Sequence, residues 1–128
     1  AMNTYAFADM ETLFMALADA TRLRILKILD RSEVCVADLS DALGESQPKI
    51  SRHLAYLRRA GLVETRRDGK WIYYRMSVPK HAGHRAILNE TLASIGSVTE
   101  EVNNIYELTD MKDTGGTVHH NELEEFLL

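Results

Sequence analysis

Residues 46–76 read SQPKISRHLAYLRRAGLVETRRDGKWIYYRM and combine the pattern of a helix with that of a hairpin. Ser46 is a good helix N-cap, because its hydroxyl can accept a hydrogen bond from an amide of the first turn. Ile50, Leu54 and Leu57 recur at intervals of four and three residues, which places them on one apolar stripe. The first half of the stretch therefore predicts an amphipathic helix with a basic outer face.

The second half of the stretch predicts a β-hairpin with strands at 63–67 and 70–76. Asp-Gly at positions 68–69 favours a two-residue turn and would place Arg67 opposite Lys70. Alternation along the strands then gives two faces. The face expected to pack on the helices holds Val63, Ile72, Tyr74 and Met76, and the aromatic and basic face holds Arg66, Trp71, Tyr73 and Arg75.

Three helical patterns precede this stretch, at 5–18, after a cap at Asp19, and at 36–43. Their expected buried residues are Phe7, Met10, Phe14 and Leu17 in the first, Leu23, Leu26, Ile28 and Leu29 in the second, and Val36, Leu39, Ala42 and Leu43 in the third. The second helix should expose Arg22, Arg24 and Lys27. Two helices joined by a turn containing glycine form a helix-turn-helix, in which 47–60 is the recognition helix. The predicted fold is mainly α with a β-hairpin wing (α+β), a winged helix-turn-helix.

A long helical pattern follows Pro79, at about 82–108, and would span roughly 40 Å. This is longer than so small a core can cover, so we expect a homodimer joined through the first and last helices, with packing inside one chain as the alternative. The apolar stripe consists of Leu88, Leu92, Ile95, Val98, Val102, Ile105 and Tyr106. Residues 1–108 would then form the DNA-binding and dimerisation domain and 109–128 a flexible acidic tail.

Composition and charge narrow the class of protein. The 128 residues suit one domain with a single core. No apolar run reaches the roughly 20 residues of a membrane span, and no secretory signal is visible, so we expect a cytoplasmic protein that has no membrane partner. The net charge of −4 is unevenly spread: 46–76 holds eight basic and two acidic residues, whereas 98–128 holds one lysine and eight acidic residues. The basic stretch is typical of nucleic-acid binding. Phosphate-binding and nucleophile motifs are absent, so an enzyme is not expected.

Four segments carry a resemblance to a known family: ALADATRLRILKIL, SEVCVADL, SQPKISRHLAYLRRAGLV and RRDGKWIYYRM. In order and spacing they resemble the ArsR/SmtB winged helix-turn-helix repressors, most closely the arsenical-resistance operon repressors. The resemblance covers about residues 13–77. It implies a homodimer that binds a palindromic operator in double-stranded DNA and is released by a metal or metalloid ion.

The sensor motif of that family is incomplete in this chain. The resemblance places a thiolate site at the start of the third helix, where Cys35 keeps the first position but Ala37 and Ser40 stand where further thiolates are expected. A single thiolate cannot satisfy trivalent arsenic, which prefers several soft ligands. The Asp-x-His motif of the family's other site does not occur. The expected inducer is therefore open: arsenite or antimonite through an unusual site, a divalent metal, a thiol oxidant at Cys35, or none.

The candidate DNA-binding residues lie on the recognition helix and the wing. N-terminal residues of a recognition helix usually reach base edges, which favours Gln47, Ser51 and Arg52; phosphates are the expected partners of Lys49 and Arg59. Tyr56 shares the outer face, and His53 is either a core-edge histidine or a phosphate contact. On the wing the candidates are Arg66, Arg67, Lys70 and Arg75, expected to meet the DNA backbone or an adjacent minor groove, with Trp71 stacked under an arginine. The alternative is an ordinary solvated basic surface.

The candidate metal ligands are Cys35, the pair His81 and His84, and the pair His119 and His120 in the tail. Each histidine pair could contribute to a divalent metal site shared between subunits, and Cys35 could equally be a packing residue. A different class of function also fits the pattern: a dimeric protein-interaction module that uses the winged helix as a scaffold.

Overall fold

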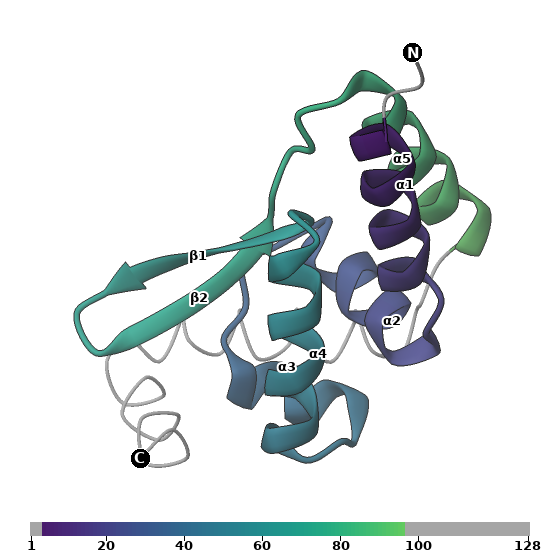
Figure 1. Cartoon of the computed structure of the whole chain (residues 1–128). Helices are drawn as coiled ribbons and strands as arrows, with labels where there is room; N and C mark the ends of the chain where they lie inside the picture. The colour runs from purple at the N-terminus through teal and green to yellow at the C-terminus, as the bar shows by residue number, and fades with distance from the viewer. Residues whose placement is uncertain (1–3, 97–128) are drawn as a thin grey trace.

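The computed structural model describes residues 4–96, and this part of the chain holds five helices and one antiparallel hairpin (Figure 1). The order of elements is the predicted one. In chain order they are α1 (Thr4–Leu17), α2 (Ala20–Leu29), α3 (Val36–Leu43), α4 (Gln47–Arg59), β1 (Val63–Asp68), β2 (Trp71–Met76) and α5 (Ala82–Ile95).

Local chemistry sets the ends of the helix-turn-helix. The Asp19 side chain accepts a hydrogen bond from the Arg22 amide at the start of α2, and Ser46 accepts one from the Lys49 amide at the start of α4. Gly44 ends α3 with φ 65°, a left-handed conformation that glycine adopts without steric cost. The turn between α3 and α4 is therefore short, and it fixes the angle between the two helices.

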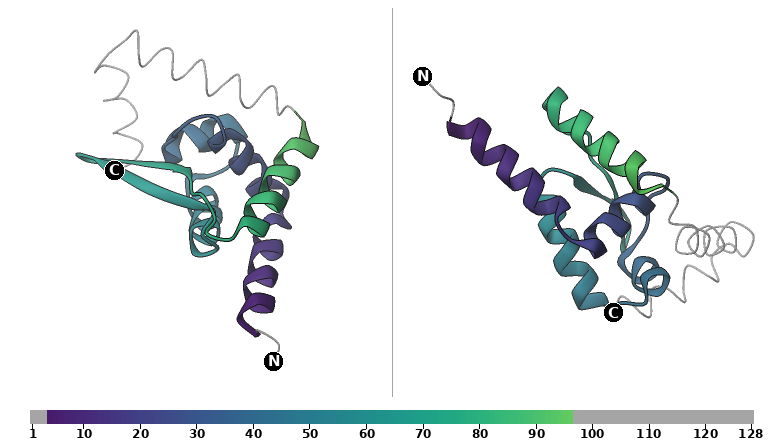
Figure 2. Two further views of the ribbon diagram at one scale, coloured as in Figure 1. Left: turned by 90° about the horizontal axis from the view of Figure 1, so that it is seen from above. Right: turned by 90° about the vertical axis from the view of Figure 1, so that its right-hand side faces the viewer.

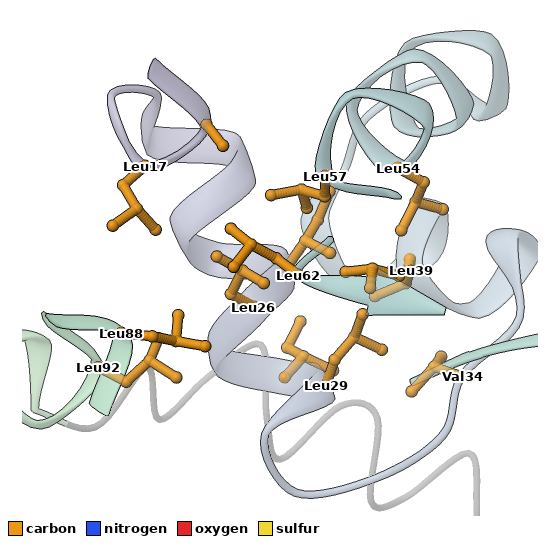
Figure 3. Close-up of a cluster of buried hydrophobic side chains, with 14 of the residues drawn as sticks. Leu17, Leu26, Leu29, Val34, Leu39, Leu54, Leu57, Leu62, Leu88 and Leu92 are labelled. Atoms are coloured by element: carbon orange, nitrogen blue, oxygen red, sulfur yellow. The ribbon is translucent and has the colours of Figure 1, made fainter. Parts of the chain in front are cut away.

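One hydrophobic core joins α2, α3 and α4 to the base of the hairpin and to α5. Figure 3 shows Leu26 and Leu29 of α2 facing Leu54 and Leu57 of α4. Ile50, Leu54 and Leu57 each have 0% of their surface exposed, so the predicted inner face of α4 is confirmed. Burying a side chain of this size stabilises the fold by about 1.5–3 kcal/mol. The recognition helix is thus anchored along its whole inner face.

The predicted inner face of α1 is wrong in two positions. Phe7 is 65% exposed and Phe14 is 53% exposed, whereas Leu13 and Ala16 are buried. The C-terminal half of α1 packs on the domain, and its buried stripe passes through Leu13 rather than Phe14. α1 and α5 lie at the end of the molecule opposite the tip of the hairpin (Figures 1 and 2).

The hairpin pairs two residues out of the predicted register. Asp68 lies opposite Trp71 and Thr65 opposite Tyr74, so Gly69 and Lys70 form the turn. A slip of two residues keeps every side chain on its predicted face, because the alternation of a strand has a period of two. The burial of the faces differs from the prediction near the tip, where Trp71 is buried at 6% exposure and Ile72 is 43% exposed.

The last helix is shorter than predicted. α5 ends at Ile95, because Gly96 has φ 74°, a value outside the helical range. The helix predicted for 82–108 therefore does not continue through Gly96. The rest of the predicted stripe, Val98, Val102, Ile105 and Tyr106, lies outside the described residues, as does the predicted tail at 109–128.

Candidate nucleic-acid interface

The outer face of α4 presents cations that are not used inside the domain. Ser51, Arg52, Arg58 and Arg59 are exposed, and Gln47 and Lys49 are half-buried. Lys49 Nζ lies 3.0 Å from Glu45 Oε2 in the preceding turn. Within residues 4–96, the side chains of Arg52 and Arg58 have neither an ion-pair nor a hydrogen-bond partner. This face is therefore free to exchange water and counterions for a polyanion.

Tyr56 connects this face to the body of the domain. Two guanidinium groups lie near its ring, with the Arg22 Cζ 4.2 Å and the Arg59 Cζ 5.6 Å from the ring centroid. Cations at such distances are attracted to the face of the ring. Tyr56 therefore fixes Arg59 on the outer face at the same time as it packs against Arg22.

Arg22 is largely buried and bonded to α1, whereas the sequence pattern predicts that it is exposed. Its Nε donates to the Ala16 carbonyl at 2.8 Å and its Nη2 donates to the Met15 carbonyl at 2.8 Å, so it closes the C-terminal end of α1. Only 12% of its side chain is exposed. Contacts with α1 and α4 cannot be read from a local pattern, because their partners are set by the tertiary fold. Arg22 thus joins α1, α2 and α4.

His53 lies at the edge of the core, beside the N-terminus of α2. Its Nδ1 is 3.4 Å from Arg22 Nη1 and 3.8 Å from Asp19 Oδ1, and 16% of its side chain is exposed. The backbone hydrogen bond from Arg22 lowers the pKa of the Asp19 carboxyl; burial opposes this, and the nearby charges of His53 and Arg22 add to the lowering. This position contributes to the joint between α2 and α4, and it leaves little of the ring available to a phosphate.

The wing differs from α4, because its inner arginines already have acidic partners. Arg66 Nε and Nη2 each lie 2.9 Å from Glu33 Oε2, and Arg75 bonds both to Glu33 Oε1 at 3.2 Å and to Glu64 Oε1 at 2.8 Å. The Arg66 Cζ also lies 4.8 Å from the centroid of the Tyr73 ring. An arginine therefore stacks on Tyr73 on this face of the hairpin. Trp71 is buried beside Cys35.

The remaining wing candidates lie at the tip. Arg67 and Lys70 are exposed on either side of Gly69, and Arg67 Nε donates to the Gly69 carbonyl at 3.1 Å. Gly69 and Lys70 form the turn of the hairpin, and Figures 1 and 2 show this end of the hairpin away from the helices. Arg67 and Lys70 are therefore the cations of the wing nearest its turn.

The segment that resembles a thiolate sensor does not offer a chelating set. Cys35 forms no disulfide in the described part of the chain, is only 1% exposed and packs with Ala37, Trp71 and Tyr73. Ser40 Oγ donates a hydrogen bond to the Glu45 carbonyl. One buried thiol beside an alanine and an engaged hydroxyl does not fit trivalent arsenic, which requires several soft ligands.

The histidine candidates are not brought together into a metal site in the part of the chain that is described. His81 and His84 have ring centroids 5.1 Å apart, and His81 Nε2 lies 3.9 Å from Asp9 Oδ2. No group of three potential ligands suited to a metal ion occurs within residues 4–96. His119 and His120 lie outside this range.

Among the helices of residues 4–96, none has both the length and the apolar character that a membrane span needs.

Known proteins match this chain both in sequence and in fold. Residues 19–65 match the family described as bacterial regulatory protein, arsR family. The arsenical resistance operon repressor of Escherichia coli is 52% identical over 79 residues, which cover 61% of this chain and 68% of that protein. An arsenic resistance transcriptional regulator of Pseudomonas putida is 54% identical over 65 residues, and the matched part spans about half of each protein, 50% of this chain and 51% of the other.

Two solved structures give the same result for the fold. The homodimeric winged helix-turn-helix DNA-binding domain from Mycobacterium bovis has a TM-score of 0.61 at 27% identity, over 71% of this chain and 82% of that one. The AntR antimony-specific transcriptional repressor has a TM-score of 0.58 at 31% identity, over 73% of this chain and 82% of that one. The winged helix-turn-helix fold is therefore confirmed.

Proposed function

The chain belongs to the arsR family of bacterial regulatory proteins, and we propose that it is a transcriptional repressor that binds operator DNA as a homodimer. The observation that carries the proposal is the outer face of α4, where Arg52 and Arg58 are exposed and have no partner within residues 4–96. The inner face of the same helix is fully buried, so these arginines stand on a rigid element.

We assign the outer face of α4 two tasks. Gln47, Ser51 and Arg52 lie in its N-terminal part, which in a recognition helix reaches base edges. Arginine suits guanine and glutamine suits adenine by the geometry of their donors and acceptors. Lys49 and Arg59 would contact phosphates, which position the protein without reading sequence. At the tip of the wing, Arg67 and Lys70 would extend the phosphate contacts.

Dimerisation is supported by apolar side chains that the single chain leaves uncovered. Phe7, Phe14 and Met15 of α1 are 65, 53 and 51% exposed, and Ile95 at the end of α5 is 38% exposed. Exposed aromatic groups of this size usually mark an interface. A twofold dimer would place two α4 helices in successive major grooves about 34 Å apart. Sedimentation of the Phe14→Glu variant should show monomers, and a wild-type chain that sediments as a monomer at all concentrations would contradict the proposal.

The direct test is a titration of the promoter DNA upstream of the gene for this protein. Fluorescence anisotropy should show saturable binding that weakens steeply with salt, because each neutralised phosphate releases counterions and contributes about 0.9 to the slope of log K against log salt. A duplex of the same length and shuffled sequence is the matched control. Absence of binding even at low salt would exclude operator recognition.

We infer that an inducer releases this operator through chemistry other than the usual three-thiolate site. Two proteins similar in sequence are named for arsenic resistance, yet the single cysteine of this chain, Cys35, is buried. The test adds arsenite, antimonite, zinc and a thiol oxidant in turn to the protein–DNA complex, with Cys35→Ser beside the wild type. Release by arsenite that the serine variant retains would show that Cys35 is not the site. Release by no compound would favour a regulator that does not sense metal.

A further inference from the structure

Glu33, in the loop between α2 and α3, makes contacts that none of the preceding roles uses. Its carboxylate bonds to two arginines of the hairpin: Oε2 to Arg66, through Nε and Nη2 at 2.9 Å each, and Oε1 to Arg75 Nη1 at 3.2 Å. Both carboxylate oxygens are therefore occupied by guanidinium groups. Such charge-assisted bonds are stronger and more directional than neutral ones.

The backbone holds Glu33 beside the wing. Its neighbour Val34 forms an isolated antiparallel bridge with Tyr74 of β2, in which each amide donates to the other carbonyl, at 3.0 and 2.9 Å. Val34 itself is buried at 2% exposure, which fixes the loop against the core. The main-chain position of Glu33 is thus set by bonds on its C-terminal side, independently of the arginines, and its carboxylate lies within reach of both.

The ion-pair network at the base of the wing carries no net formal charge. It consists of two acids and two bases: Glu33 and Glu64 with Arg66 and Arg75. The hydrogen bond from Arg75 to Glu64, and to a smaller extent the one to Glu33, raises the pKa of the Arg75 guanidinium. Arg66 is further held over the ring of Tyr73. A phosphate that approached either arginine would also approach a carboxylate, which repels it.

We propose that Glu33 is a positioning residue that keeps Arg66 and Arg75 away from DNA phosphates, so that the wing meets DNA through Arg67 and Lys70 at its tip. The inference rests on the proposed function, because it concerns how the chain binds an operator. It reassigns Arg66 from a DNA contact to an internal partner of Glu33. The consequence is specificity: two cations that would bind any duplex are withdrawn from the interface.

The test is Glu33→Gln in the full-length protein, with operator and shuffled duplexes titrated over a range of salt. Freeing one or two guanidinium groups should steepen the slope of log K against log salt by about one to two and should tighten binding to the shuffled duplex about three- to tenfold at moderate salt. The gain on the operator should be no larger, so the ratio of specific to non-specific affinity falls. An unchanged slope, or weaker binding to both duplexes, would overturn the proposal.

Two controls separate positioning from a general change of charge. Glu90→Gln removes the same charge from an exposed site on α5 and should leave the slope unchanged. Arg66→Ala alone should alter operator affinity less than twofold, whereas Arg66→Ala added to Glu33→Gln should cancel most of the gain. Equal effects of Glu90→Gln and Glu33→Gln would show that only net charge matters, and a large loss from Arg66→Ala alone would restore Arg66 as a DNA contact.

A measurement without DNA distinguishes failure of this inference from failure of the proposed function. In the NMR spectrum of the free protein, the Nε–H signals of Arg66 and Arg75 should be protected from exchange in the wild type and in Glu90→Gln, and that of Arg66 should lose protection in Glu33→Gln. Protected signals in a chain that binds no DNA would contradict the repressor but leave the ion-pair network intact. An unprotected Arg66 signal in the wild type would refute the role of Glu33 directly.

Discussion

The recognition helix and the wing are both basic in sequence, yet they hold their charges in opposite ways. On α4, Arg52 and Arg58 point away from a fully buried inner face and have no partner within residues 4–96. On the hairpin, Arg66 and Arg75 are tied to Glu33 and Glu64. A count of formal charge treats the two elements alike. The structure shows that two arginines of α4 have exposed side chains outside any ion pair within residues 4–96, whereas Arg66 and Arg75 of the hairpin are held by carboxylates.

The largest expected effect removes the support of α4. Leu54→Ala deletes a side chain with no exposed surface, so it should lower the free energy of unfolding by about 2–5 kcal/mol. Ile72→Ala is the matched change on the hairpin, where the side chain is 43% exposed, and it should cost well under half as much. Chemical denaturation measures both. Similar losses at the two positions would mean that the wing is as firmly packed as the recognition helix.

The next effect concerns affinity rather than folding. Arg52→Ala should weaken operator binding by about 1–3 kcal/mol, because it removes a proposed bidentate base contact, and it should leave stability within about 0.5 kcal/mol because the side chain is exposed. Substitution scans of each operator base should show relaxed preference at one position. Unchanged operator affinity would remove Arg52 from the base-reading set and reduce the contrast between helix and wing.

A smaller effect tests the joint beneath α4. Asp19→Ala removes the N-cap of α2 and should destabilise the protein by about 1 kcal/mol, whereas Asp19→Asn keeps a capping side chain without the charge. Because the folded-state pKa of Asp19 is lowered below 3.8, its charge stabilises the protein above that pH, and this contribution is lost as the pH falls through the lowered pKa. Thermal melts of the wild type and Asp19→Asn should therefore converge as the solution is acidified below about pH 4. Parallel curves would show that the Asp19 charge does not matter.

Local patterns in the sequence predicted the order of elements, the caps at Asp19 and Ser46 and the buried stripe of α4, because each depends on residues a few positions apart. The pairing of Glu33 with Arg66 joins residues 33 positions apart, and no local rule indicates it. The exposure of Phe14 could not be predicted for a similar reason. An apolar stripe shows that a helix has a covered face, but it does not show whether the cover is the same chain or another one.

The candidate site was predicted in its elements but not in its internal connections. The hairpin register slipped by two because Asp68 pairs as a strand residue and leaves Gly69 and Lys70 to turn. A glycine that ends a helix and a glycine that a helix tolerates look the same in a sequence. The end of α5 at Gly96 could therefore not be predicted. Such differences depend on backbone angles, which composition does not determine.

Arg22 has a consequence for the kind of DNA that this protein can accept. It bonds to two carbonyls at the end of α1 and lies against Tyr56 of α4, so the helix that would join two subunits and the helix that would read bases turn together. In such a dimer the distance between the twofold axis and each DNA half-site could vary little. Operators in which the spacer between half-sites is lengthened or shortened by a single base pair should therefore be rejected, even when every base within the half-sites is correct.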